Sequence, residues 1–493
     1  PFIKWHRPKR LIKRFARTWR CWVMANSWKT LKLGDVTKWS SGGTPKKSEA
    51  SYWDGEIPWI SASSMEGHLY TDSKLKITEA GLANGSRLAP KNSILLLVRG
   101  SILHQKMQVG LTTRPVAFNQ DVKCLVADEE YLDPWYLLLW FKAKEQELLT
   151  IVESTGIGAG KFDTKLLSEY PIKIPPKDER EKIKEFGQAL FDKSTNLIET
   201  NQTLEQMAQA LFKSWFVDFD PVIDNALAAG KDIPEALQHK AELRKQAQQL
   251  SASPEIKSKP LPEDIRALFP SEFEQTHVPN IGIAGWIPKG WKACPMSELV
   301  EVASSKRVFA KDYVDSGVPF FRGKEITELS QGKKVNTEIF ITEEKYQELK
   351  DKAGAPKEGD ILITSVGTIG NTYLVKKSDK FYFKDGNLTW IKSYKKAFMP
   401  FYLKEWFNSN AAKDALERIK IGTTQQAITI KALNTVAMLN PTSEIIDIFE
   451  AHAKDIYQKH EANFQQINSL AKTRDVLLPK LISGDITINE DVA

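Results

Sequence analysis

Two segments carry residues that resemble nucleotide or nuclease chemistry, but neither has the complete spacing. The run Gly156 to Lys161 is rich in glycine and ends in Gly-Lys, as a phosphate-binding loop does. A Walker A loop needs glycine five residues before its Gly-Lys and serine or threonine after it. Thr155 and Phe162 occupy those two places, so we predict a flexible loop and not a nucleotide-binding site. A nuclease-like Glu-x-Lys starts at Glu343, within a Glu/Lys-rich segment that is typical of a solvated helix.

Other catalytic and metal-binding patterns are incomplete too. An adenine methyltransferase grips its base with Asn/Asp-Pro-Pro-aromatic, and Asn440 to Ser443 lacks the second proline and the aromatic. The three cysteines match no zinc spacing, and neither do the histidines that we considered, which are His68, His104, His239, His277, His452 and His460. We therefore expect a chain that is not an enzyme, with no catalytic residue, no metal site and no cofactor of its own.

Composition favours a cytoplasmic protein of several domains. With 493 residues, 42% of them hydrophobic, the chain exceeds the usual size of one domain. Its apolar runs are shorter than the ~18 residues that a membrane helix needs. The sparse and odd number of cysteines argues against a disulfide-stapled secreted protein. We therefore expect no membrane contact and a cytoplasmic location.

The net charge of +7 comes from the beginning of the chain. Residues 1–23 hold eight basic residues and no acidic one, and the remainder is nearly neutral. We interpret this segment as a leader before a true start at Met24, with a DNA-contacting basic arm as the alternative. Overall charge is therefore weak evidence for DNA binding, and local clusters must supply it.

The chain contains a long, divergent internal repeat, which bears on the whole fold. Six matches occur in the same order, with partners separated by 261 to 267 residues. Two of them relate Ile57-Pro58-Trp59-Ile60 to Val318-Pro319-Phe320-Phe321, and Arg99-Gly100-Ser101-Ile102 to Val366-Gly367-Thr368-Ile369. Each copy has short β-branched and aromatic runs between Gly, Pro and Asn, which indicates strands and turns with a few helices.

Each copy is followed by a segment with the heptad pattern of a coiled-coil seam. In the first segment the predicted seam is Ile183, Phe186, Leu190, Lys193, Leu197, Thr200, Leu204, Met207 and Leu211. In the second it is Ile446, Phe449, Ala453, Ile456, His460, Asn463, Ile467, Leu470, Arg474, Leu477 and Leu481. Polar residues interrupt both seams near their centres, so antiparallel pairing would bring the interruptions together. We predict that the two helices pair antiparallel.

The predicted fold class is α+β: two α/β domains separated by two long antiparallel coiled-coil helices, with pseudo-twofold internal symmetry. The predicted boundaries are a basic extension over 1–27, a first domain over 28–175, a central helix over 176–221, a connector over 222–290, a second domain over 291–440, a distal helix over 441–486 and a tail over 487–493.

These features resemble the specificity subunits of type I restriction-modification systems. The resemblance is sharpest at Leu211 to Pro221, at Gly285 to Trp291 and at Arg474 to Gly484, and Pro171 to Lys184 adds to it. It covers about residues 24 to 486. It implies two target recognition domains, each reading one half of a split, asymmetric site in double-stranded DNA. It also implies two methyltransferase subunits and restriction subunits as partners, on which S-adenosylmethionine, ATP and Mg²⁺ would be bound.

Local charge supports a DNA-binding face in each half. Residues 85–125 hold six basic residues and one acidic residue, and residues 352–396 hold nine lysines and four acids. Such groups contact phosphates, whereas Arg, Lys, Asn and Gln read base edges. The predicted contacts are Arg99, Ser101, Gln105, Lys106 and the loop Gly158 to Lys161 in the first domain, and Arg322, Lys324, Ser365, Thr368, Asn371, Thr424, Gln425 and Gln426 in the second.

Two alternatives from other functional classes remain at this point. The chain would be a coiled-coil scaffold with two protein-binding domains if it failed to bind DNA even with methyltransferase subunits present. It would be a DNA methyltransferase with unrecognised motifs if the purified chain alone transferred methyl groups to DNA.

Overall fold

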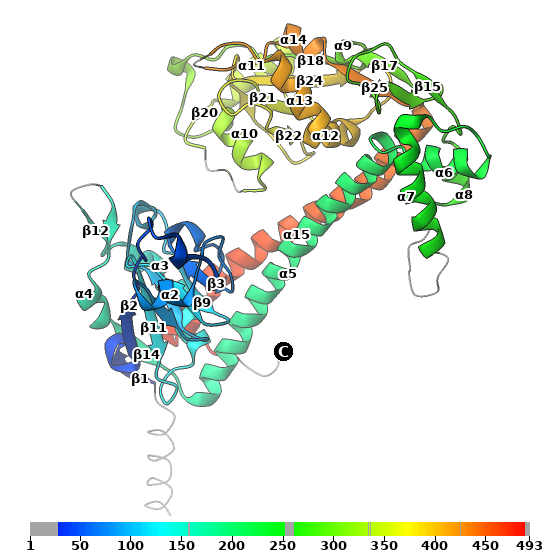
Figure 1. The fold of residues 1–493 in the computed structure, drawn as a ribbon. Coiled ribbons are helices and arrows are strands. Elements are labelled where there is room, and N and C mark those ends of the chain that lie inside the picture. The colour runs from blue at the N-terminus through cyan, green and yellow to red at the C-terminus, as the bar shows by residue number, and fades with distance from the viewer. Residues whose placement is uncertain are drawn as a thin grey trace, which may run out of the picture. The chain divides into compact units, whose positions relative to one another are not determined.

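The computed structural model describes residues 28–155, 158–251, 261–333, 335, 337–423 and 425–488. The basic extension over 1–27 therefore lies outside the described residues. The chain forms two compact units (Figure 1). The first comprises Pro1–Ile198 and Phe464–Ala493, and the second Glu199–Asn463. Each unit holds one mixed α/β domain and part of each long helix, as the fold-class prediction states.

In the first unit, one hydrophobic core joins two sheets, a helix and the helix pair. The five-stranded sheet has the order β2-β11-β7-β9-β4 (Thr37–Ser41, Val122–Ala127, Ile94–Leu97, Val109–Thr112, Leu69–Tyr70). The four-stranded sheet has the order β5-β3-β10-β6 (Lys76–Ile77, Trp53–Ile60, Val116–Phe118, Arg87–Ala89). Strand β7 is buried along its whole length. Helix α3 (Pro134–Leu149) begins at Asp133, which caps its first turn, and buries Tyr136, Trp140 and Phe141 in this core.

The second unit repeats this plan with a smaller sheet. Its main sheet has the order β18-β24-β21-β22 (Val300–Ala303, Leu388–Tyr394, Ile361–Thr364, Thr372–Leu374), and a second sheet the order β20-β19-β23 (Phe340–Ile341, Val318–Phe321, Tyr382–Phe383). Helix α10 (Gly323–Ser330) packs beside β21 and β22. Helices α11 (Glu343–Ala353), α12 (Pro400–Asn408), α13 (Asn410–Ile419) and α14 (Ile430–Asn434) complete the domain.

Equivalent hydrogen bonds confirm the internal repeat. In the first unit β1 (Lys29–Lys32) pairs antiparallel with β14 (Pro171–Ile174), and in the second β17 (Lys292–Pro295) pairs antiparallel with β25 (Ala437–Asn440). The Tyr136 hydroxyl donates to the Lys173 carbonyl oxygen at 2.9 Å, and the Tyr402 hydroxyl donates to that of Leu439 at 2.6 Å. The same bond thus attaches the closing strand of each domain to its main helix.

The long helices α5 (Lys177–Phe216) and α15 (Ser443–Ser483) pair antiparallel, as predicted. Within the second unit, Phe216 contacts Phe449 and Glu205 contacts His460. Residue numbers therefore rise along one helix in the direction in which they fall along the other. Aromatic residues of the Leu211 to Pro221 segment, among them Phe212 and Trp215, are buried in the core of this unit. In the first unit, the core takes up Leu478, Leu481 and Ile482 from the end of α15.

The seam of α15 is confirmed, since every predicted position is buried or half-buried. The seam of α5 is only half right. Ile183, Leu190, Leu197, Leu204 and Leu211 face inward, but the alternate positions are Gly187, Ser194, Asn201, Ala208 and Trp215. Lys193, Thr200 and Met207 are exposed, whereas Phe186 is half-buried and packs against the core of the first unit. The predicted phase of the alternate positions is one residue early, because Phe186 and Met207 are apolar whereas small and polar residues occupy most of the alternate seam positions.

The connector is structured where it is described. It contains α6 (Asp220–Ala228), α7 (Glu235–Ser251), α8 (Glu263–Arg266) and the hairpin β15–β16 (Phe273–Gln275, Trp286–Pro288). Asp218 pairs with Lys240, and Asp224 with Arg244, so acidic residues between α5 and α6 and within α6 hold α7. Among the described residues, every helix is too short or too polar to cross a lipid bilayer.

Candidate nucleic-acid interface

In the first domain, the structure brings together the two segments that contain the predicted contacts. Strand β8 (Arg99–Gly100) pairs antiparallel with β13 (Gly160–Lys161), so that Arg99 lies opposite Lys161. On its other side Lys161 faces Glu153 of β12 (Glu153–Ser154). Opposed residues on one face of a sheet are within about 5.5 Å at Cβ, and like charges there are unfavourable. Two exposed cations are therefore held side by side, and the Glu153 carboxylate faces only one of them.

The remaining residues of this cluster extend from the short helix η4 (Ser101–His104). Ser101, Gln105 and Lys106 are all exposed. Gly158 has a φ of 76°, in the left-handed region that glycine favours, and its carbonyl oxygen lies 3.2 Å from His104 Nε2. His104 is exposed and joins this cluster through that contact. Sequence reasoning missed it because it matches no metal-ligand spacing.

In the second domain, the equivalent loop lies between β21 and β22 and is closed by its own hydrogen bonds. Asn371 N–H donates to Thr364 Oγ1 at 3.0 Å, and Asn371 Nδ2 donates to Thr327 Oγ1 at 3.1 Å. Thr327 Oγ1 also lies 3.3 Å from that of Thr368, which is exposed. Thr327, on α10, is thus a further member of this cluster, and only the fold identifies it.

A second segment lies beside this loop and brings in the predicted glutamines. Val366 and Ala427 form a β-bridge, and Gly367 N–H donates to the Gln426 carbonyl oxygen at 3.4 Å. Gln425 and Gln426 are exposed. Thr424 lies outside the described residues. The structure therefore places Thr368, Asn371 and both glutamines on neighbouring loops.

Three predicted residues of the second domain have different surroundings. Ser365 is buried at 4% exposure, and its backbone bonds Asn387 and Ile428, so its side chain lies inside the domain. Arg322 donates through Nη2 to Glu325 at 2.7 Å. Burial opposes the charge of Glu325, but hydrogen bonds from Arg322 hold the pKa of this carboxyl below its usual value. Lys324, on the same helix, is exposed.

The two clusters share one backbone frame. Phe162 N–H donates to the Val98 carbonyl oxygen, and Ile428 N–H donates to that of Ser365, each at 2.9 Å. Arg99 follows Val98 and Lys161 precedes Phe162, just as Val366 follows Ser365 and Ala427 precedes Ile428. Arg99 and Lys161 therefore correspond to Val366 and Ala427. The side chains differ while the frame is kept.

A family model matches both halves of the repeat. It is described as "Type I restriction modification DNA specificity domain" and covers residues 26–206 and 288–467. The part of the connector between these ranges, with α6 to α8, lies outside the match.

Relatives and a solved structure agree with this match. The chain is 24% identical over 472 residues to the type I restriction enzyme MjaIX specificity subunit of Methanocaldococcus jannaschii, covering 94% of each chain. It is 36% identical over 173 residues to the EcoR124I/EcoR124II specificity subunit of Escherichia coli, covering 35% of this chain and 42% of the relative. The S subunit from M. genitalium has the same fold, with a TM-score of 0.50 at 13% identity over 93% of this chain and 96% of the other. The chain therefore belongs to the family of type I restriction-modification specificity subunits, which are not themselves the catalytic subunits.

Proposed function

We propose that this chain binds a split, asymmetric site in double-stranded DNA and directs two methyltransferase subunits and the restriction subunits to it. Each domain reads one half-site through its own cluster of exposed cationic and amide side chains. The observation that carries this proposal is the shared frame with different side chains, in which Arg99 and Lys161 stand where the second domain has Val366 and Ala427. The partner subunits bind S-adenosylmethionine, ATP and Mg²⁺, and the complex works in the cytoplasm.

The helix pair supplies the spacing between the half-sites. A coiled coil couples its ends in distance but transmits no information on base identity. Two linked DNA-binding domains also gain affinity, because the binding of one domain raises the effective concentration of the other at its half-site.

The test is an exchange of one domain. Residues 28–170 are replaced by the matching domain of a related subunit, the hybrid is expressed with the methyltransferase subunits, and the methylated motif is read by methylome sequencing. One half of the motif should change while the other half and the gap stay. A change in both halves would contradict independent reading. Methyl transfer by the purified chain alone, or a complex that binds no DNA, would favour the enzyme or the scaffold alternative.

A further inference from the structure

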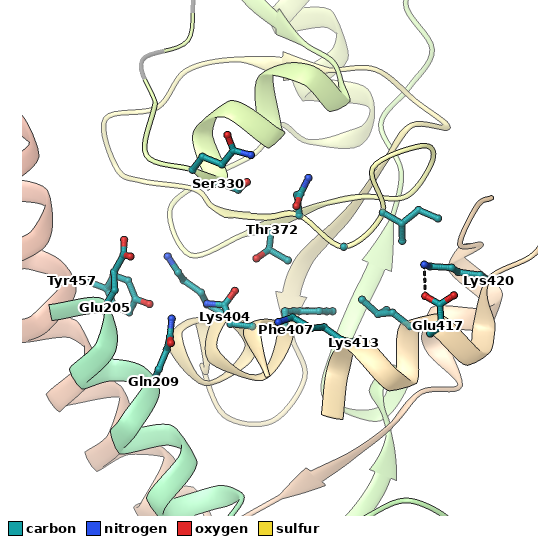
Figure 2. A pocket seen from close by; sticks show the side chains of 16 residues that line it. Glu205, Gln209, Ser330, Thr372, Lys404, Phe407, Lys413, Glu417, Lys420 and Tyr457 are labelled. Carbon is teal, nitrogen blue, oxygen red and sulfur yellow. Dashed lines mark hydrogen bonds and ion pairs between the residues drawn. The ribbon is translucent and has the colours of Figure 1, made fainter. Parts of the chain in front are cut away.

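Each unit contains a cavity where its domain meets the helix pair. The cavity of the second unit has a volume of about 640 Å³ and is lined by the β21–β22 loop, by α12 and α13, and by Glu205 and Tyr457 of the long helices. Figure 2 shows the Lys404 side chain between Glu205 and Tyr457 on one side and Thr372 on the other. The cavity of the first unit is smaller, at about 180 Å³, and is lined by the segment after η4, by α3, and by Arg474 and Asp475 of α15.

The two cavities occupy corresponding places in the repeat. Helices α3 and α12 align through Pro134-Trp135-Tyr136 and Pro400-Phe401-Tyr402. In this alignment Lys404 corresponds to Leu138, and Lys142 lies four residues further, on the same helix face. A lysine of the main helix thus lines both cavities, although it comes from a different position in each.

The acidic residues of the cavities are already occupied. Glu205 lies 3.0 Å from His460 Nε2, and Glu417 pairs with Lys420. In the first unit, Glu145 accepts the Met107 N–H at 2.8 Å, and Asp475 lies 2.7 Å from Arg474. Each of these contacts satisfies a carboxylate before any ligand arrives.

Two lysines in each cavity remain without such a partner. None of the ion pairs within 4.0 Å among the described residues includes Lys404 or Lys413 of the second unit, or Lys106 or Lys142 of the first. Carboxylates lie farther off, since the charges of Glu205 and Glu405 act on Lys404, and that of Glu145 acts on Lys142. Lys404 stands 4.4 Å over the Tyr457 ring. Burial lowers the pKa of Lys142 and of Lys404, so an anion that replaced the lost water would stabilise both ammonium groups.

The position of the cavities favours DNA as the source of that anion. Lys106 follows Ser101 and Gln105 along the chain, and the loop that lines the larger cavity follows Thr368 and includes Asn371. Both cavities are therefore continuous with the predicted reading segments. Because the half-sites differ, features common to both halves are suited to the phosphate backbone, which is the same for every sequence.

We propose that the two cavities are corresponding anchoring sites for DNA backbone phosphates, one for each half-site, which act without regard to base sequence. This inference rests on the proposed function and goes beyond it by assigning a sequence-independent contact to named lysines. Lys106, which lines the cavity of the first unit, is thereby assigned to the phosphate backbone and not to base reading. The other members of the two clusters would read bases, and the cavities would hold the duplex in register for that reading.

The experiment measures DNA affinity against salt concentration for the complex of the full chain with its methyltransferase subunits. The variants are Lys404→Met with Lys413→Met, and Lys106→Met with Lys142→Met. The controls are Lys431→Met and Lys165→Met, two exposed lysines outside the cavities. The slope of log affinity on log salt should fall by about 0.9 for each lost phosphate contact, so by about 2 in each double variant, and the methylated motif should stay unchanged. Arginine at the same positions should restore the slope.

A second measurement uses duplexes in which single phosphates are replaced by neutral methylphosphonates. At a contacted phosphate, the replacement should weaken binding by the normal complex and add nothing in the lysine variant. The proposal is overturned if the double variants keep the slope of the controls or relax one half-site. Loss of the methyltransferase subunits instead of DNA affinity would overturn it in favour of a protein carboxylate as ligand. If the normal complex does not bind its own motif, the proposed function fails rather than this inference.

Discussion

Asn463 Nδ2 donates a hydrogen bond of 2.9 Å to Asn201 Oδ1, between the facing helices α5 and α15. Asn201 Nδ2 donates in turn to the His460 carbonyl oxygen at 3.2 Å. The two side chains are only 7% and 2% exposed, so water cannot replace these bonds. A buried asparagine pair in a coiled coil selects the register in which both amides are satisfied, at some cost in stability.

We expect Asn463→Leu to destabilise the second unit by about 1–3 kcal/mol, because it leaves the Asn201 amide oxygen buried without a donor. The double variant Asn201→Leu with Asn463→Leu should recover most of this loss, since both partners are then apolar. Urea unfolding of the two variants and the parent checks this prediction. Equal destabilisation by the single and double variants would show that the pair contributes by shape and not by hydrogen bonding.

The equivalent tyrosines give a prediction that is local to each unit. Tyr136→Phe leaves the Lys173 carbonyl oxygen without its donor, and Tyr402→Phe does the same to that of Leu439. Each should cost about 1 kcal/mol. Hydrogen exchange should quicken in β1 and β14 for the first variant, and in β17 and β25 for the second. Tyr52→Phe is the control, since its hydroxyl has no protein partner among the described residues, and uniform quickening in both units would contradict the expectation.

A pH dependence should come from Glu450 of α15. This carboxyl accepts the Tyr402 and Phe401 N–H groups at the start of α12, at 2.8 and 3.3 Å. Burial raises its pKa from 4.5 to about 8. A raised pKa in the folded state gives stability that is full below pH 4.5 and is lost as the pH rises to about 8, at up to ~1.4 kcal/mol per unit.

We therefore expect Glu450→Gln to stabilise the chain relative to the parent at pH 8.5 and to have little effect at pH 4.5. Thermal melting at several pH values measures the difference. The exposed Asp455, changed to Asn, serves as the control on the same helix. A stability difference that did not grow with pH would show that Glu450 is ionised in the folded chain throughout this range.

Much of the architecture could be predicted because repeats and helices leave periodic patterns. The sequence predicts the seam of α15 correctly, since His460, Asn463 and Arg474 continue the period that its apolar residues begin. In α5, Gly187, Ser194 and Asn201 face inward without being hydrophobic, so only the partner helix reveals them.

The candidate site was less accessible to sequence reasoning. Arg99 and Lys161 are 62 positions apart, and their pairing depends on strand register. Ser365 is a polar residue, which favours an exposed position, but it directly follows the buried strand β21 and lies inside the domain. The free cations of the cavities come from four separate positions, which no local motif relates.

Lengthening the helix pair should change the gap between half-sites. One heptad inserted beside Leu204 in α5, with a matching heptad in α15, adds about 10 Å while keeping the seam. The methylated motif should keep both half-sites and gain a gap longer by about three base pairs, at 3.4 Å each. Methylome sequencing measures the gap, and an unchanged gap with full activity would show that the helix pair does not set the spacing.

Point changes at the two clusters should act on separate half-sites. Arg99→Ala removes one of the two cations that face each other in β8 and β13, and Gln425→Ala removes an exposed amide of the second domain. Base-edge contacts are typically worth about 1–3 kcal/mol, so competition with duplexes altered at one base pair resolves their loss. Arg99→Ala should relax only the half-site that the first domain reads, and Gln425→Ala only the other. Lys165→Ala, on an exposed helix outside the first cluster, should relax neither. If Arg99→Ala weakened binding equally for every sequence and lowered the salt slope, Arg99 would be a phosphate contact, and base reading in this domain would fall to Gln105 and the residues beside it.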